Sequence, residues 1–314
     1  MSSFGDLNRV NTNIQSLDSQ LSLNRINRDL GDNQLKLSTG LRINRAEDDA
    51  AGYSIATKLN SRVAGLEQAL QNVGDAKSVL DIAESSFDTV MDNLIEMKAL
   101  ATQAANDTLG EEERGYIGAQ ISKLADDIND IANQTVFQDS ELLNGSVTGD
   151  GTATNTGDFS MTFQVGERST DTLTTDLAAV NVGELFAAGA DAELGDVAGT
   201  IVATEATAGS QGTITFDDAT AADFRSMIEN IDTAIGGMND RVNEIGMTQS
   251  SLSIREVTLS QSISANSAAS SRIMDADFAK EQSESVRLQI LQQTSTSALA
   301  QANMGPQSVL GFLG

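Results

Sequence analysis

The chain offers few residues of the kinds that perform catalysis or hold metals. Its 314 residues include no Cys, no His and no Trp, which excludes His- or Cys-based triads, thiolate zinc sites and CxxC redox centres. The remaining candidates are carboxylates. Asp126, Asp127 and Asp130 share one face of a predicted helix, where paired carboxylates can act as acid and base, although a solvated surface is the commoner reason for such a face.

Loop motifs give no stronger sign of a small-molecule site. Residues 149–155, GDGTATN, superficially suggest a cation loop, but they lack the alternating Asp/Asn ligands and the terminal Glu that calcium requires. No Gly-rich phosphate loop occurs, and Asn106, Asn133 and Asn144 begin N-glycosylation sequons that a Thr/Asn-rich chain contains by chance. We therefore predict that the protein is not an enzyme and holds neither a cofactor nor a metal.

The charge of the chain limits its partners. Lys and Arg number 19 against 45 Asp and Glu, for a formal net charge of −26, which repels phosphate backbones and anionic lipids. No apolar run of about 18 residues occurs, and the first residues lack the basic and apolar regions of a signal peptide. We expect no nucleic-acid binding, no membrane insertion and no cleavable signal.

Helical periodicity organises most of the chain. From Phe224 to Ile273 apolar residues recur at the 4-3 spacing of a coiled-coil seam. Upstream, one such seam runs over 59–94 and a second over 79–104, which predicts packing against more than one neighbour. Thr108 and Glu111 predict a capping box at the start of a third, shorter helix. Some polar residues on the seams either lie at the bundle edge or set the register: Glu84, Asn93 and Glu256.

Both ends of the chain carry thinner apolar stripes. Each terminal helix alone would bury little apolar area, whereas ordering its backbone costs about 1–2 kcal/mol per residue. We therefore predict that both ends fold only in contact with other copies. The predicted self-assembly residues are Leu7, Val10, Ile14, Leu17, Leu21, Ile26, Leu30 and Leu37 at one end and Val286, Ile290, Leu291, Leu299 and Met304 at the other.

Between the rods, residues 147–222 are rich in Gly, Thr, Ala and Asp. The alternation of Phe159, Met161, Phe163 and Val165 and the run 213–216 predict short β-strands. The predicted fold is mainly α: a long coiled-coil-like helical bundle formed by the N- and C-terminal segments, with a small β-containing central insertion. We expect five parts, at 1–45, 46–146, 147–222, 223–274 and 275–314.

Two segments resemble the signatures of the bacterial flagellins. Residues 37–52, LSTGLRINRAEDDAAG, resemble the N-terminal signature. Residues 271–303 resemble the C-terminal signature, with SRI at 271–273, DFA at 277–279, QILQQ at 289–293 and LAQAN at 299–303. The similar regions cover about 1–145 and 220–314, whereas the central segment resembles nothing in particular.

The resemblance implies a structural subunit that self-assembles into the helical flagellar filament for motility. It implies that 1–45 and 275–314 pair as inner-tube helices, that the rods form the surrounding shell, and that a polar link joins them through Arg42, Asn44, Asp48, Asp49 and Gly52. It also implies secretion through a type III-like export channel to an extracellular filament. The implied partners are other copies, an export chaperone on about 275–314, the filament cap protein and hook-associated proteins.

Residues 94–103, LIEMKALATQ, align with a segment that a vertebrate Toll-like receptor recognises in enterobacterial flagellins, which places Leu94, Glu96, Leu100 and Gln103 in a receptor-like segment. Those flagellins have an Arg where this chain has Glu96, so we expect weak receptor activation. Two alternatives to a filament subunit remain. One is a hook–filament junction protein, and the other is a secreted hydrolase or adhesin that uses the insertion as its site.

Overall fold

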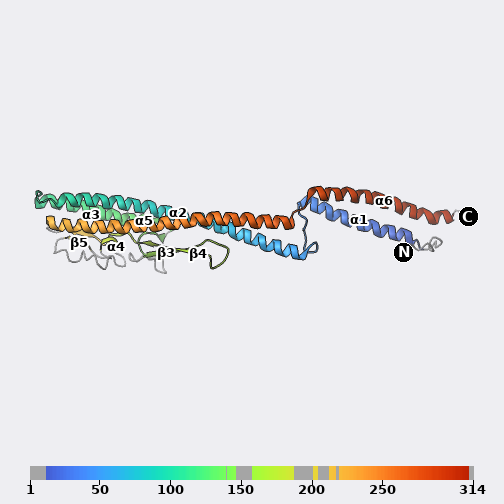
Figure 1. Cartoon of the computed structure of the whole chain (residues 1–314), viewed down its shortest axis with the longest axis horizontal. Helices are drawn as coiled ribbons and strands as arrows, with labels where there is room; N and C mark the ends of the chain where they lie inside the picture. The colour runs from blue at the N-terminus through green and yellow to red at the C-terminus, as the bar shows by residue number, and fades with distance from the viewer. Residues whose placement is uncertain are drawn as a thin grey trace. The chain divides into compact units, whose positions relative to one another are not determined.

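In the residues it describes, the computed structural model contains six helices and three pairs of short antiparallel strands (Figure 1). These residues are 12–138, 140–145, 158–186, 201–203, 212–216 and 219–310, and the side chains of 201–203 and 305–310 are not described. The chain divides into two compact units. We call Met1–Ala64 with Ile263–Gly314 the terminal unit, and Gly65–Ser262 the rod unit. The mainly helical fold with a β-containing insertion is as predicted.

The rod unit is built on three helices, α2 (Ala50–Ala104), α3 (Glu111–Gln134) and α5 (Ala221–Met274). The first part of α2 and the last part of α5 belong to the terminal unit. In this unit α5 buries residues at every seventh position, together with others such as Met227 and Ala234; the repeating set is Phe224, Ile231, Met238, Ile245, Leu252 and Leu259. On α2 one buried stripe consists of Leu66, Val73, Leu80, Phe87 and Leu94, and a second of Ala69, Ala76, Ala83, Val90 and Met97. Most of these residues occupy alternate positions of the predicted 4-3 seams. On α5 the predicted positions Ile228 and Ile235 are half-buried, and their neighbours Met227 and Ala234 are buried instead.

Polar residues on these seams make contacts between α2 and α5. Gln249 donates from Nε2 to Glu84 Oε2 at 2.8 Å and to Asp81 Oδ1 at 3.0 Å. Lys77 Nζ lies 2.7 Å from Glu256 Oε2. Exposed ion pairs contribute little to stability, so these contacts at the bundle edge chiefly fix how the two helices align.

The start of α3 differs from the prediction. The helix begins at Glu111 with Gly110 as its N-cap residue and no side-chain cap, so the predicted Thr108–Glu111 capping box is wrong. Thr108 instead lies in a local turn, in which its backbone N–H donates to Asn106 Oδ1 at 3.2 Å. Three consecutive Glu residues in the first turn, 111–113, complement the positive end of the helix dipole.

The insertion consists of short strands and one short helix. The strands are β1 (Val136–Phe137), β2 (Ser140–Glu141), β3 (Asp158–Gln164), β4 (Thr172–Ala178), β5 (Ile201–Ala203) and β6 (Ile214–Phe216), and the helix is α4 (Val182–Phe186). The strands pair antiparallel as β1–β2, β3–β4 and β5–β6. The predicted strands at 159–165 and 213–216 correspond to β3 and β6, whereas no local pattern predicted β4 or α4.

Contacts at β3 and β6 are among those that hold the insertion against the helices of the rod unit. Asn72 of α2 donates from Nδ2 to the Gln164 carbonyl of β3 at 3.0 Å. The ring of Phe216 of β6 stacks on Phe224 of α5, with centroids 5.6 Å apart. A Cβ on Gly118 of α3 would lie 2.8 Å from the ring of Phe216, so β6 can approach α3 this closely only because that residue has no side chain.

Candidate functional site

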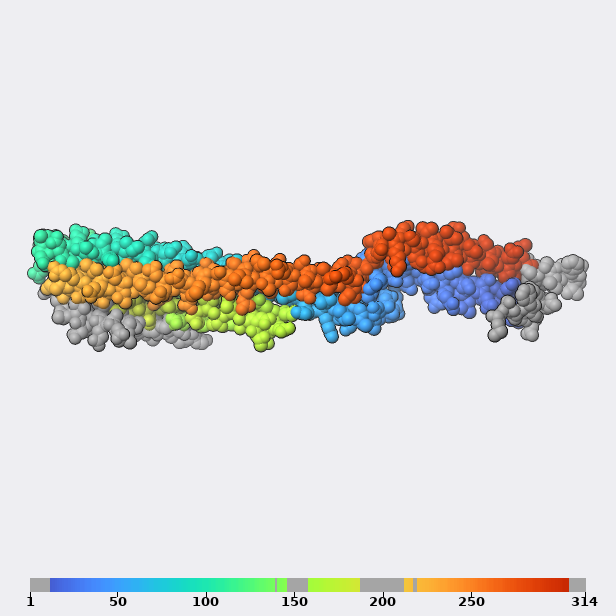
Figure 2. Space-filling view, in the orientation of Figure 1, coloured from blue at the N-terminus to red at the C-terminus, as the bar shows by residue number. Residues whose placement is uncertain are grey.

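The terminal helices α1 (Ile14–Thr39) and α6 (Phe278–Leu310) lie side by side in the terminal unit (Figures 1 and 2). They run antiparallel, because Asn13 at the start of α1 bonds to Ala302 near the end of α6, and Asn33 bonds to Glu281 near its beginning. The seam between them is the set of residues that are wholly or partly buried. Among the described side chains of α6, and apart from Glu284, these recur with 4-3 spacing: Glu281, Ser285, Leu288, Gln292, Ser295, Leu299 and Ala302.

The seam between the terminal helices is largely polar. Among the described residues, hydrogen bonds cross it at four places: Asn13 Nδ2 to the Ala302 carbonyl at 2.8 Å, Ser16 Oγ to Asn303 Oδ1 at 2.8 Å, Gln292 Nε2 to Asn27 Oδ1 at 2.8 Å, and Asn33 Nδ2 to Glu281, at 2.7 Å to Oε2 and 3.1 Å to the carbonyl. Leu288 and Ala302 are the apolar residues of α6 that are buried. A seam of this kind fixes alignment but adds little hydrophobic stabilisation.

Sequence reasoning missed these amides and hydroxyls, because it followed apolar residues alone. A signal for them exists in the sequence. Ser285, Gln292 and Ser295 continue the 4-3 spacing of Leu288 and Leu299. Small or polar residues at such positions are expected where two helices pack closely together.

The predicted self-assembly residues divide between the seam and the surface. Ile26, Leu30, Leu37 and Leu299 are half-buried in the seam. The others in the described range are exposed: Ile14 by 37%, Leu17 and Leu21 by 55%, Val286 by 47%, Ile290 by 58%, Leu291 by 38% and Met304 by 67%. Leu7 and Val10 lie outside the described residues.

Most of the exposed residues lie away from the seam between the two helices. Ile14, Leu17 and Val286 follow a seam position by one residue, whereas Leu21, Ile290 and Met304 follow one by two. Each residue turns a helix by about 100°, so residues one step beyond the seam lie to one side of it, and residues two steps beyond lie nearly opposite it. We call this set the outer stripe: Ile14, Leu17, Leu21, Val286, Ile290 and Met304.

The predicted link residues tie the two connections of the terminal unit together. Leu41, after α1, forms an antiparallel bridge with Asp275, between α5 and α6. Arg42 donates from its backbone N–H to the Met274 carbonyl at 2.6 Å and from its guanidinium to the Ile273 carbonyl at 2.8 Å. The Asn44 side chain donates to the Leu41 carbonyl at 2.9 Å. The connection from α1 to α2 and the connection from α5 to α6 are therefore held together by one hydrogen-bonded strip.

Two carboxylates shape the turn before α2. Asp48 Oδ2 accepts backbone N–H bonds from Asn44 and Arg45, each at 2.9 Å, and these bonds hold the pKa of Asp48 below its usual value. Asp49 Oδ1 accepts from the Gly52 N–H at 3.0 Å at the start of α2. A Cβ on Gly52 would lie 2.6 Å from Asp49 Oδ2 and 2.8 Å from Ile43 Cδ1. A side chain at this position would therefore have to displace the ends of the Asp49 and Ile43 side chains.

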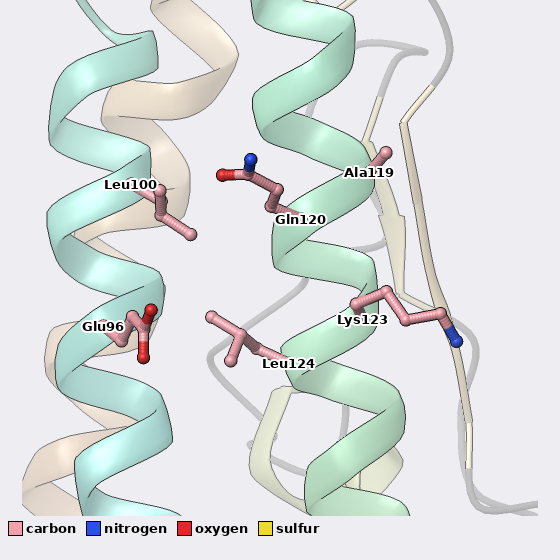
Figure 3. Close-up of a pocket in the computed structure, with 6 residues that line it drawn as sticks. All are labelled: Glu96, Leu100, Ala119, Gln120, Lys123 and Leu124. Carbon is pink, nitrogen blue, oxygen red and sulfur yellow. The ribbon is translucent and has the colours of Figure 1, made fainter.

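The receptor-like segment lies on α2 in the rod unit. Leu94 is fully buried in the core, whereas Glu96 and Gln103 are exposed and Leu100 is half-buried. Glu96 and Leu100 face Gln120 and Leu124 of α3 across an open groove of about 360 Å³, which Ala119 and Lys123 also line (Figure 3). Buried Leu94 thus supports the helix that presents Glu96, and only the other three residues are accessible to a partner.

The described residues show two further features that bear on function. None of their helices combines the length and the apolar character needed to cross a bilayer. They also contain no group of three or more Asp and Glu side chains arranged to hold a metal ion. The carboxylates of Asp126, Asp127 and Asp130 lie on α3, where Asp126 pairs with Lys123 at 3.1 Å.

Comparison with known proteins gives matches over most of the chain. Residues 10–148 match the family model of the bacterial flagellin N-terminal helical region, and 228–313 match that of the C-terminal helical region. A flagellin of Bacillus subtilis (strain 168) is 36% identical over 313 residues, covering 97% of this chain and 99% of that protein. The flagellar filament 33 kDa core protein of Treponema phagedenis is 32% identical over 304 residues, with the same coverage.

Among solved structures, a putative flagellar hook-associated protein from Vibrio parahaemolyticus matches with a TM-score of 0.55. The match covers 73% of this chain and 100% of that chain at 16% sequence identity. At this identity the likeness shows a shared fold alone.

Proposed function

The chain belongs to the bacterial flagellin family, the structural subunits of flagellar filaments, and on this premise we propose that its terminal helices gain a hydrophobic core only when copies assemble. The observation that carries this proposal is the division of side chains in the α1–α6 pair. The pair meets through a polar seam, while the outer stripe of apolar residues faces solvent. A second copy of the pair would cover that stripe.

The energetic argument compares what one chain can bury with what assembly adds. Full burial of a Leu or Ile side chain contributes about 1.5–3 kcal/mol. In one chain the residues of the outer stripe remain between 37% and 67% exposed, so much of this contribution is still to be gained. Because backbone ordering opposes folding by about 1–2 kcal/mol per residue, the terminal helices of a lone subunit are only weakly stabilised.

This division also fits the parts assigned from the resemblance. We assign 1–45 and 275–314 to the inner tube, 46–146 and 223–274 to the surrounding shell, and 147–222 to the variable outer part. A contact between copies that does not close on itself produces an open helical polymer, and such a tube transmits torque for motility. The strip that joins Leu41 to Asp275 would hold both connections between tube and shell.

Weak folding of the terminal helices also suits export. A subunit whose tails are not yet packed can pass unfolded through a type III-like channel to an extracellular filament. We propose that an export chaperone covers 275–314 beforehand, including Val286, Ile290 and Leu291, and that the filament cap protein receives the subunit at the tip. Hook-associated proteins would contact the same helices at the base of the filament.

The curated relatives described above span nearly the whole chain and are a flagellin and a filament core protein. They support a filament subunit over a hook–filament junction protein, whose likeness here extends to the fold alone. Membership of a structural family likewise supports a protein without catalysis over a hydrolase or adhesin centred on 147–222.

Two measurements on purified protein test the proposal. Addition of sheared filament fragments to monomer should yield long tubes in electron micrographs. Hydrogen exchange should then show α1 and α6 unprotected in dilute monomer and protected in the tubes, with the rod unit protected in both. A monomer whose two tails are already protected from exchange would refute coupled folding and assembly, and a failure to seed tubes would refute the filament function.

A further inference from the structure

The proline of the C-terminal helix lies where the two terminal helices are tied at their free ends. Helix α6 extends to Leu310 and so contains Pro306, the single proline of the chain. A proline has no backbone N–H, so within a helix it deprives the carbonyl four residues earlier of its usual donor. That carbonyl belongs to Ala302.

The Ala302 carbonyl receives its donor from the other helix. Asn13 Nδ2 donates to it at 2.8 Å. The Oδ1 atom of the same amide accepts from the Ser16 backbone N–H at 3.1 Å and thereby caps the first turn of α1. Ala302 is only 8% exposed, so water replaces a lost donor poorly and an unpaired carbonyl here is costly. One side chain thus completes the hydrogen bonding of both helices.

We infer that Asn13 is a latch that holds the free end of α1 against α6, and that Pro306 creates the acceptor it recognises. The opposite end of the pair is already fixed by the bridge between Leu41 and Asp275 and by the bonds from Asn33 to Glu281. About 20 residues of helix, or roughly 30 Å, separate Asn33 from Asn13. Without Asn13, the first turns of α1 retain the Ser16–Asn303 hydrogen bond and the thin seam.

The inference rests on the proposed function, because the latch fixes the end of the outer stripe that copies would bury. Ile14 of α1 follows Asn13 directly, and Met304 of α6 lies two residues beyond Ala302. Both are exposed. The latch therefore holds these two apolar side chains, which come from opposite ends of the chain, at the same end of the helix pair, where a neighbouring copy would bury them.

Three substitutions separate the latch from the helix cap. Asn13→Asp keeps a side-chain oxygen to cap α1 but removes the amide donor. Asn13→Ser also keeps a capping oxygen, without a charge, and is too short to reach Ala302. Pro306→Ala restores a backbone N–H to the helix, which supplies the Ala302 carbonyl from within α6 and makes the latch redundant.

Disulfide formation reports whether the free end is closed. The chain has no Cys, so introduced pairs are the sole reactive thiols. Ser16→Cys with Asn303→Cys places a pair beside the latch, where the native side chains bond at 2.8 Å. Asn27→Cys with Gln292→Cys provides a matched control pair further along the seam, where they also bond at 2.8 Å. Each variant is assembled as a minor fraction with wild-type chains, so that a weakened tail cannot prevent tube formation.

Loss of one neutral hydrogen bond should change the closed population about fivefold. We expect Asn13→Asp and Asn13→Ser each to slow intrachain crosslinking of the 16–303 pair about fivefold and to leave the 27–292 pair within about twofold. In the Pro306→Ala background, the effect of either substitution should fall below about twofold.

Crosslinking of the 16–303 pair at the wild-type rate in Asn13→Asp would overturn the latch. Slower crosslinking in Asn13→Asp but not in Asn13→Ser would also overturn it, because that result would indicate charge repulsion. An equal loss with and without Pro306 would also overturn it. Tubes that form normally while these outcomes occur would leave the filament function standing, so the two ideas fail separately.

Discussion

Replacing Leu17 and Leu21 by Ser tests whether the outer stripe drives assembly. Both side chains are 55% exposed in the single chain. If full burial of a Leu contributes about 1.5–3 kcal/mol, the exposed half of each corresponds to about 1 kcal/mol still to be gained. The pair then accounts for about 2 kcal/mol of subunit association, which corresponds to about a thirtyfold rise in the critical concentration of Leu17→Ser/Leu21→Ser.

The critical concentration is measured as the protein that remains in the supernatant when seeded polymerisation reaches equilibrium and tubes are sedimented. A matched control is Gln15→Ser/Gln20→Ser, which changes two exposed polar residues of the same helix and introduces serines of the same low helix propensity. The control should stay within about twofold of wild type. A critical concentration of Leu17→Ser/Leu21→Ser that matched the control would refute the role of the outer stripe.

Three further predictions follow from the link, the receptor-like groove and the charge. Gly52→Ala would place a Cβ 2.6 Å from Asp49 Oδ2 and 2.8 Å from Ile43 Cδ1, so it should destabilise the link by about 1–3 kcal/mol. Faster hydrogen exchange at 41–49 would show this, whereas Gly31→Ala, in open space, should not change it. Glu96→Arg should raise activation in a Toll-like receptor reporter assay, because it replaces a repelling charge on the groove with a bidentate donor; an unchanged response would contradict this. Raising NaCl from about 0.1 M to about 1 M shortens the Debye length from about 10 Å to about 3 Å. The critical concentration should therefore fall steeply for subunits of net charge −26. Light scattering that does not depend on salt would contradict this prediction.

The sequence determined the rod unit because its information is local and periodic. Each turn of α2 and α5 presents the same face, so the seven-residue spacing of residues such as Ile231, Met238 and Ile245 already states which side is buried. On α2, where two such stripes occur, both are buried. The alternation at 159–165 identified β3 for the same reason, since a strand that packs on one face shows a period of two.

Local signals failed where two interpretations of the same residues compete. The Thr108–Glu111 spacing is that of a capping box, yet the nearby Asn106 bonds the Thr108 N–H in a turn and α3 starts after Gly110. β4 reads TLTTDLA, and its assignment depends on pairing with β3 from Asp158↔Ala178 to Gln164↔Thr172. Such pairings are contacts between separate segments, which a local pattern does not encode.

The terminal helices show most clearly what the tertiary structure decided. The sequence contains two stripes on α1, Ile14 to Leu21 and Leu23 to Leu37, and periodicity does not say which one meets α6. The structure places the second in the seam and exposes the first. It also shows that amides such as Asn13 and Asn33 occupy the seam. Hydrophobic burial is non-directional, whereas a hydrogen bond requires its donor and acceptor to meet at about 2.9 Å, and only the folded arrangement of distant segments fixes which of them do.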